Sequence, residues 1–195
     1  MPLSHAARDE DVEMATMLLD RGADVNSVDE MGWTPLMVAA EGGLEAMGSL
    51  LLDRGANPNA CSEDGDTPLL LAARAGCVEL VAKLLDLGAD PEAQDKSERL
   101  TAISIAAENS HLEMVELFLT RGISPDEYDS TLLCALQDRE RSETVDSEGY
   151  RLVQTLVKHG VEVFMVACLD DQPLVIAARR GLKNIVELFL QAEFS

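Results

Sequence analysis

The chain repeats a pair of short apolar helices. Leu36, Ala39 and Ala40 fall at i, i+3 and i+4, which predicts one apolar stripe on a helix. Thr34 is suited to cap that helix, and Pro35 is tolerated at its first position because a proline lacks only an N–H that would be unpaired there. A glycine pair then ends the helix. The inner face of a second predicted helix, which ends at Gly55, consists of Leu44, Met47, Leu50 and Leu51.

The same helix pair returns at a constant interval. Pro35 follows Pro2 at the same distance along the chain as Pro68 follows Pro35, and looser copies begin at Thr101 and Gln172. The ends of the second helices also repeat: residues 18–26, 51–59 and 84–91 share a Leu-Leu-Asp-x-Gly-Ala pattern, followed by Asp or Asn. These two motifs, recurring in phase over nearly the whole chain, resemble the ankyrin repeat family, whose period matches this interval and whose signature is T-P-L-H-x-A.

The resemblance implies an all-α ankyrin-repeat solenoid of about six helix-turn-helix repeats with short β-hairpin fingers, forming a single domain over residues 1–195. The expected repeats are 1–29, 30–62, 63–95, 96–129, 130–167 and 168–195. The first repeat has no hairpin, which suits either an N-terminal capping repeat or a boundary cut within a longer chain.

The fifth repeat departs from the pattern. Its stretch from Thr131 to Gly160 is longer by eight positions than the matching stretch from Thr101 to Gly122 in the fourth repeat. The insertion lies within 137–149, and its polar and charged composition suits either a solvated loop or a longer first helix.

Composition narrows the classes of partner. The net charge of −21 argues against direct nucleic-acid binding and against anionic membranes, because both need Lys and Arg on the protein. No apolar run approaches the roughly 20 residues of a membrane helix. The N-terminus does not look like a signal peptide. The four cysteines are far apart, so we expect free thiols in a reducing compartment, the cytoplasm or the nucleus.

No catalytic constellation is apparent in the sequence. His5, His111 and His159 fall in three different repeats, and no glycine-rich phosphate loop is present. We therefore expect no enzyme activity, no cofactor and no metal. Cys77 takes the place of a family histidine and is interpreted as a small buried hydrophobe, with a reactive thiol as the alternative.

The resemblance places partner contacts mainly on the finger tips and on the exposed end of each first helix. The matching positions are Glu30, Met31, Trp33, Glu41, Glu63, Asp64, Asp66, Arg74, Lys96, Ser97, Glu108, Asn109, Asp170, Asp171, Arg179 and Arg180. The alternative is that most of these are solvated polar positions. Trp33, the only tryptophan, is expected to be exposed and to act as the anchor.

These features predict a monomeric, non-catalytic protein–protein interaction module, an adaptor, scaffold or inhibitor. Its partner is expected to offer a basic or mixed basic–hydrophobic segment, since the predicted fingers are rich in Asp and Glu. Two alternatives stay open. The chain can be a regulatory or targeting domain of a larger multidomain protein, or its acidity can serve solubility alone.

Asn26 is a candidate for hydroxylation. Residues 18–26 are similar to the segments that asparaginyl hydroxylases modify in ankyrin repeats. The alternative is a structural asparagine that bonds to the adjacent hairpin.

Overall fold

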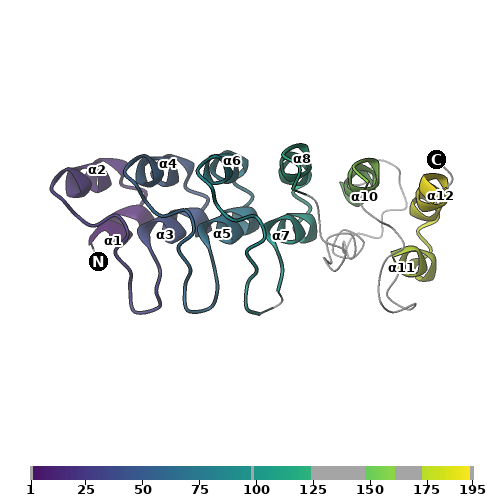
Figure 1. Ribbon diagram of the computed structural model, residues 1–195, viewed down its shortest axis with the longest axis horizontal. Coiled ribbons are helices and arrows are strands. Elements are labelled where there is room, and N and C mark those ends of the chain that lie inside the picture. The colour runs from purple at the N-terminus through teal and green to yellow at the C-terminus, as the bar shows by residue number, and fades with distance from the viewer. Residues whose placement is uncertain (1, 98, 124–147, 161–172, 194–195) are drawn as a thin grey trace. The chain divides into compact units, whose positions relative to one another are not determined.

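The computed structural model describes residues 2–97, 99–123, 148–160 and 173–193 (Figure 1). These residues form eleven α-helices and no strand, which confirms an all-α repeat solenoid. The chain divides into two compact units, Met1–Ala102 and Ile103–Ser195. Most of the predicted insertion, residues 137–147, lies outside the described residues, as do Asp170 and Asp171.

The first unit is a double row of helices. The first helices of successive repeats pack on one another, as do the second helices, and each first helix packs on its own second helix (Figure 1). The first helices are α1 (Pro2–Arg8), α3 (Pro35–Glu41) and α5 (Pro68–Ala75). The second helices are α2 (Val12–Asp20), α4 (Glu45–Asp53) and α6 (Val78–Asp86).

The predicted helix starts form as local chemistry dictates. The Thr34 hydroxyl accepts the N–H of Met37 at 3.2 Å, and the Thr67 hydroxyl accepts the N–H of Leu70 at 3.3 Å. Each threonine is followed by the proline that opens its helix. The capping prediction is therefore confirmed at α3 and α5.

Small residues let the rows approach closely. Ala39, Ala40 and Ala73 in the first helices are fully buried. In the second row, a Cβ placed on Gly48 would lie 2.7 Å from a methyl carbon of Leu80. The Leu80 side chain of α6 therefore packs directly against the backbone of α4 at Gly48.

The second unit contains helices of the later repeats. They are α7 (Ala102–Glu108), which begins at the last residue of the first unit, α8 (Leu112–Thr120), α10 (Glu148–Lys158), α11 (Pro173–Arg180) and α12 (Lys183–Glu193). The second helix α10 packs against both α8 and α12, and α11 packs against α12. Phe118, Leu156 and Phe189 are fully buried in this unit.

The fingers of the first unit are hairpin-shaped turns that project beyond the row of first helices (Figure 1). One backbone N–H to C=O bond closes each: Asp29 to Trp33 at 3.0 Å, Ser62 to Asp66 at 3.0 Å, and Asp95 to Leu100 at 3.3 Å. The third finger spans one residue more between these positions, and nearby Arg99 has a φ of 58°. A single bond of this kind is enough to close a short turn, so the fingers keep a hairpin shape without paired strands.

Candidate functional site

The three fingers of the first unit are bonded to one another as a continuous edge. The Glu63 N–H donates to the Met31 carbonyl at 3.3 Å, and the Lys96 N–H donates to the Asp64 carbonyl at 3.4 Å. The Lys96 ammonium also donates to the Glu63 carbonyl. All three bonds involve backbone atoms of the fingers, so the side chains at the tips are held at a fixed spacing.

Two acidic side chains, neither of them among the expected contacts, hold the fingers together internally. The Asp29 carboxylate accepts the N–H groups of Met31 at 3.0 Å and Trp33 at 2.9 Å. The Asp95 carboxylate is buried and accepts the N–H of Leu100 at 3.1 Å and the hydroxyl of Ser97 at 2.9 Å. Both carboxylates shape the turns; that of Asp95 is buried, whereas Asp29 stays exposed.

Arg74 at the end of α5 pairs with carboxylates of the chain itself. Its guanidinium lies 3.5 Å from a carboxylate oxygen of Asp66 and 3.6 Å from one of Asp95, which belong to successive fingers. The two carboxylates therefore largely balance the Arg74 charge within the edge. Arg74 was expected to contact a partner, but its guanidinium already has partners in the chain itself.

Six predicted contact residues are exposed on the finger tips: Glu30, Met31, Glu63, Asp64, Lys96 and Ser97. Met31 has 57% of its surface exposed. Trp33 is only partly exposed, contrary to the expectation that it stands free at the tip. Sequence reasoning missed Val28, which is 49% exposed at the base of the first finger.

The remaining predicted residues divide between the units. Glu41 is exposed at the end of α3, within the first unit. Glu108, Asn109, Arg179 and Arg180 are exposed at the ends of α7 and α11, in the second unit. The structure therefore brings together only the first-unit members of the predicted set.

Asn26 lies beside the next repeat and bonds to it. Its amide nitrogen donates to the Gly55 carbonyl at 3.3 Å, and its amide oxygen accepts the N–H of Asn57 at 2.8 Å. Asn59, at the equivalent position of the next repeat, makes the same bonds with Gly88 and Asp90, both at 2.8 Å. Asn59 follows Asn26 by one repeat period, so the sequence could have predicted the same role for Asn59. The structural role of Asn26 is thus present, and its hydroxylation stays a prediction.

Among the described residues, no group of three or more His, Cys, Asp or Glu side chains could hold a metal ion. Cys61 and Cys77 are free thiols. Burial raises the pKa of the Cys77 thiol, which disfavours the reactive thiolate. None of the described helices combines the length and the apolar character needed to cross a membrane.

Comparison with known proteins gives similarity over most of the chain. A family model described as ankyrin repeats (3 copies) matches residues 3–95, and one described as ankyrin repeat matches residues 98–130. No curated protein matches the sequence.

Solved structures are similar over almost the full length. An ankyrin repeat domain from Acinetobacter baumannii AYE is 28% identical with a TM-score of 0.86, over 98% of this chain and 97% of that one. The human ASB11 ankyrin repeat domain is 27% identical with a TM-score of 0.79, over 98% and 83%. The ankyrin repeat protein EF0377 is 25% identical with a TM-score of 0.85, over 97% and 96%.

Proposed function

Because the chain belongs to the ankyrin repeat family, a general protein-interaction fold, we propose that it is a non-catalytic adaptor, scaffold or inhibitor that binds a partner protein along its finger edge. The partner offers a basic or mixed basic–hydrophobic segment. The module acts as a monomer in the cytoplasm or nucleus and binds neither nucleic acid nor membrane directly.

The observation that carries this proposal is the fixed row of exposed carboxylates on bonded fingers. Glu30, Glu63 and Asp64 are exposed at tips whose backbones are hydrogen-bonded to one another. Arg74, the cation expected to oppose them, is already paired with carboxylates of the edge. The acidic array lies on the first two fingers, because Lys96 and Arg99 are exposed on the third. A rigid acidic array attracts a cationic segment and loses little conformational entropy when the segment binds.

Affinity also needs a desolvated apolar contact, since exposed charge pairs contribute little. The exposed Met31 follows Glu30 in the first finger, and its carbonyl accepts the N–H of Glu63 in the second finger. The partly exposed face of Trp33 is in the same finger. Together these side chains offer an apolar surface to the hydrophobic residues of a mixed segment.

Two alternatives compete with this function. The same edge would serve in a regulatory or targeting domain of a larger multidomain protein, and the reading frame of the full gene decides between the two. If the acidity serves solubility alone, the positions of the carboxylates should not matter.

The experiment compares two variants with the same change in net charge. One neutralises the finger tips by Glu30→Gln, Glu63→Gln and Asp64→Asn. The other neutralises the second helices by Glu13→Gln, Glu45→Gln and Glu79→Gln, which are exposed at the starts of α2, α4 and α6. None of the three substituted tip side chains makes the inter-finger bonds, so those bonds should persist in both variants.

Partners enriched by the wild-type chain in quantitative affinity proteomics should be lost from the finger variant and kept by the helix variant. Equal loss from both would show that total charge, and not the finger edge, governs binding. Unchanged enrichment in the finger variant would refute the edge as the site.

A further inference from the structure

Neighbouring second helices in the first unit are joined by ion pairs. The Arg54 guanidinium on the α4 side lies 2.8 Å from the Asp20 carboxylate of α2. The Lys83 ammonium of α6 lies 2.8 Å from the Asp53 carboxylate of α4, and it also donates to the Ser49 carbonyl at 3.3 Å. Lys83 therefore covers the junction between α4 and α6.

The repeat register locates the equivalent junction between α10 and α12. Lys158 precedes Gly160 by two positions, as Asp53 precedes Gly55. Leu188 stands as far after Pro173, the proline that opens its repeat, as Lys83 stands after Pro68. The lysine–aspartate pair is thus replaced by a leucine and a lysine, which cannot form an ion pair.

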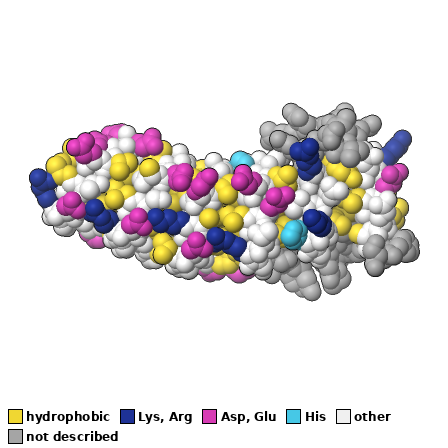
Figure 2. All heavy atoms as spheres, turned by 90° about the horizontal axis from the view of Figure 1, so that it is seen from above, with side chains coloured by type: hydrophobic (Ala, Val, Ile, Leu, Met, Phe, Trp, Pro, Cys, Tyr) yellow, Lys and Arg dark blue, Asp and Glu magenta, His cyan; other side chains and the backbone are white. Residues whose placement is uncertain are grey.

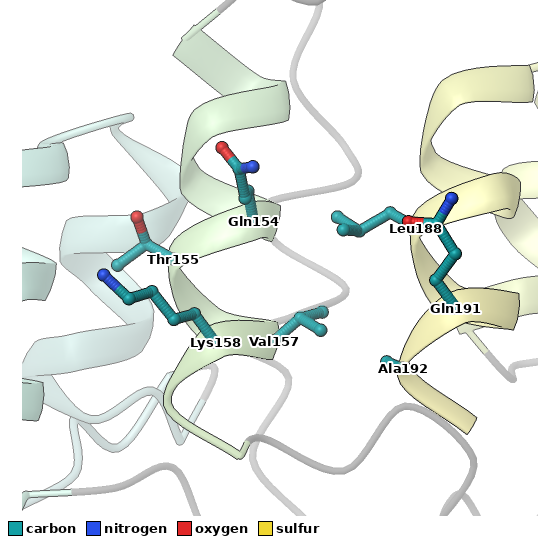
Figure 3. A pocket seen from close by; sticks show the side chains of 7 residues that line it. All are labelled: Gln154, Thr155, Val157, Lys158, Leu188, Gln191 and Ala192. Carbon is teal, nitrogen blue, oxygen red and sulfur yellow. The ribbon is translucent and has the colours of Figure 1, made fainter. Parts of the chain in front are cut away.

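An open groove of about 590 Å³ is present at this junction, between α10 and α12. Figure 3 shows Val157 and Leu188 pointing toward each other across it, with Lys158 on the side of α10 away from α12. Gln154 also lines the groove, and its side-chain amide can bond to a peptide backbone. In the space-filling view onto the second helices, apolar side chains remain visible in this part of the second unit (Figure 2).

Lys158 is the one charged side chain among the described residues that line the groove, and the exposed Glu187, which precedes Leu188 on α12, does not line it. Arg151 and Lys158 fall seven positions apart on one face of α10, separated by roughly 10 Å along the helix axis. The groove-lining side chains of α12, Leu188, Gln191 and Ala192, carry no charge. Among the described residues, no carboxylate pairs with the Lys158 ammonium.

We propose that the groove between α10 and α12 binds an acidic, amphipathic segment of a partner protein. Apolar side chains of the segment pack on Val157 and Leu188, and a carboxylate takes the place at Lys158 that Lys83 takes at Asp53, with the signs reversed. A helix that bears leucines on one face and glutamates beside them satisfies both features. This site goes beyond the finger edge, because it lies in the other unit and selects the opposite charge.

The groove favours a peptide over a polyanion. Nucleic acid would need many cations to replace its counterions, whereas this chain carries a net charge of −21. A small phosphate ion would leave the apolar pair Val157 and Leu188 uncovered. A segment that combines apolar side chains with one or two carboxylates fits both parts of the groove.

Fluorescence anisotropy with the full chain and defined peptides tests the proposal. The probe is a labelled amphipathic helix of about 15 residues with leucines on one face and glutamates flanking them. Comparison peptides replace every glutamate by glutamine or by lysine, or every leucine by serine. Variants of the protein are Lys158→Asp, the double variant Lys158→Asp with Leu188→Lys, and the control Lys183→Asp, a charge change on α12 outside the groove lining.

The double variant places an aspartate and a lysine at the register positions of Asp53 and Lys83, so the two new charges are opposite and the variant should fold as stably as the wild type. The leucine–glutamate peptide should bind the wild type and Lys183→Asp equally, within about twofold, and both groove variants at least about tenfold more weakly. The three comparison peptides should each bind the wild type more weakly than the probe.

Absence of binding at millimolar peptide, equal binding to the double variant, or equal binding of the lysine peptide would each overturn the proposal. Self-association of the chain that Leu188→Lys abolishes would also overturn it, because a second copy would then be the occupant.

Discussion

Replacing Asn59 by alanine should measurably loosen the stack of repeats in the first unit. The Asn59 amide donates to the Gly88 carbonyl and accepts the N–H of Asp90, both at 2.8 Å. Alanine removes both bonds and leaves one carbonyl and one N–H of the next repeat without their protein partner.

The expected size follows from the two bonds and their exposure. A protein hydrogen bond contributes about 0.5–1.5 kcal/mol net, so two give about 1–3 kcal/mol. Asn59 is exposed, and water can replace part of what is lost. We therefore expect the free energy of unfolding to fall by about 1–2 kcal/mol.

The assay is urea unfolding followed by far-ultraviolet circular dichroism, with the free energy taken from the midpoint and slope. Asn59→Asp keeps the acceptor and loses the donor, so it separates the two bonds and should fall between wild type and alanine. A loss below about 0.3 kcal/mol for Asn59→Ala would show that the two Asn59 hydrogen bonds do not stabilise the stack, since that is within the additivity error of such measurements.

Three further results are expected. Gly48→Ala should lower the free energy of unfolding by about 1 kcal/mol. The new methyl group overpacks against the buried Leu80, and this cost outweighs the gain in helix propensity of up to about 1 kcal/mol. An increase in stability would show that Leu80 can move aside. Thr34→Ala should lower the free energy of unfolding by about 1 kcal/mol through loss of the α3 cap, and Thr34→Ser should restore most of it, whereas a silent alanine variant would contradict the cap assignment. Alkylation of Cys77, followed by mass spectrometry across pH, should reach half of its maximal rate at a higher pH than alkylation of a cysteine in a short unstructured peptide, because burial raises the pKa of the Cys77 thiol and leaves less thiolate at any given pH. Half-maximal labelling at the same or a lower pH than the peptide would contradict this.

Helix boundaries could be predicted from the sequence because they depend on neighbouring residues. Thr34 caps α3 and Thr67 caps α5 through bonds that reach only three residues along the chain. Gly76 ends α5 with a φ of 77°, a conformation that glycine adopts without strain. The constant repeat period then transferred each local prediction to the next repeat.

Burial and pairing could not be predicted in the same way, because they depend on contacts between repeats. Met14 and Met47 hold equivalent positions in successive repeats, yet Met14 is 40% exposed and Met47 is fully buried. Trp33 is half-buried, which its place beside a turn does not reveal. The carboxylates that pair with Arg74 belong to two different fingers, so its neutralisation depends on how the fingers are stacked.

The sequence predicted which residues lie on the fingers better than it predicted what each of them does. Glu30, Met31, Glu63 and Asp64 are exposed on the finger tips as expected. Asp66 was expected to contact a partner, but its carboxylate pairs with Arg74 within the edge. A residue's type and register therefore locate it on the finger. Whether its side chain is available to a ligand depends on the partners it has within the chain.

The association rate with the partner identified by the finger comparison tests the central claim most directly. It is measured by surface plasmon resonance at two salt concentrations for wild type, the finger-neutralised variant and Trp33→Ala. Wild-type association should slow as salt rises, since the Debye length falls from roughly 10 Å at 0.1 M to roughly 3 Å at 1 M, and the finger variant should be slower and less sensitive to salt. Trp33→Ala should leave the association rate nearly unchanged and weaken affinity by about 1 kcal/mol or more. A rate that ignores salt, together with a Trp33→Ala effect below about 0.5 kcal/mol, would contradict a finger edge that attracts a basic segment and anchors it on apolar side chains.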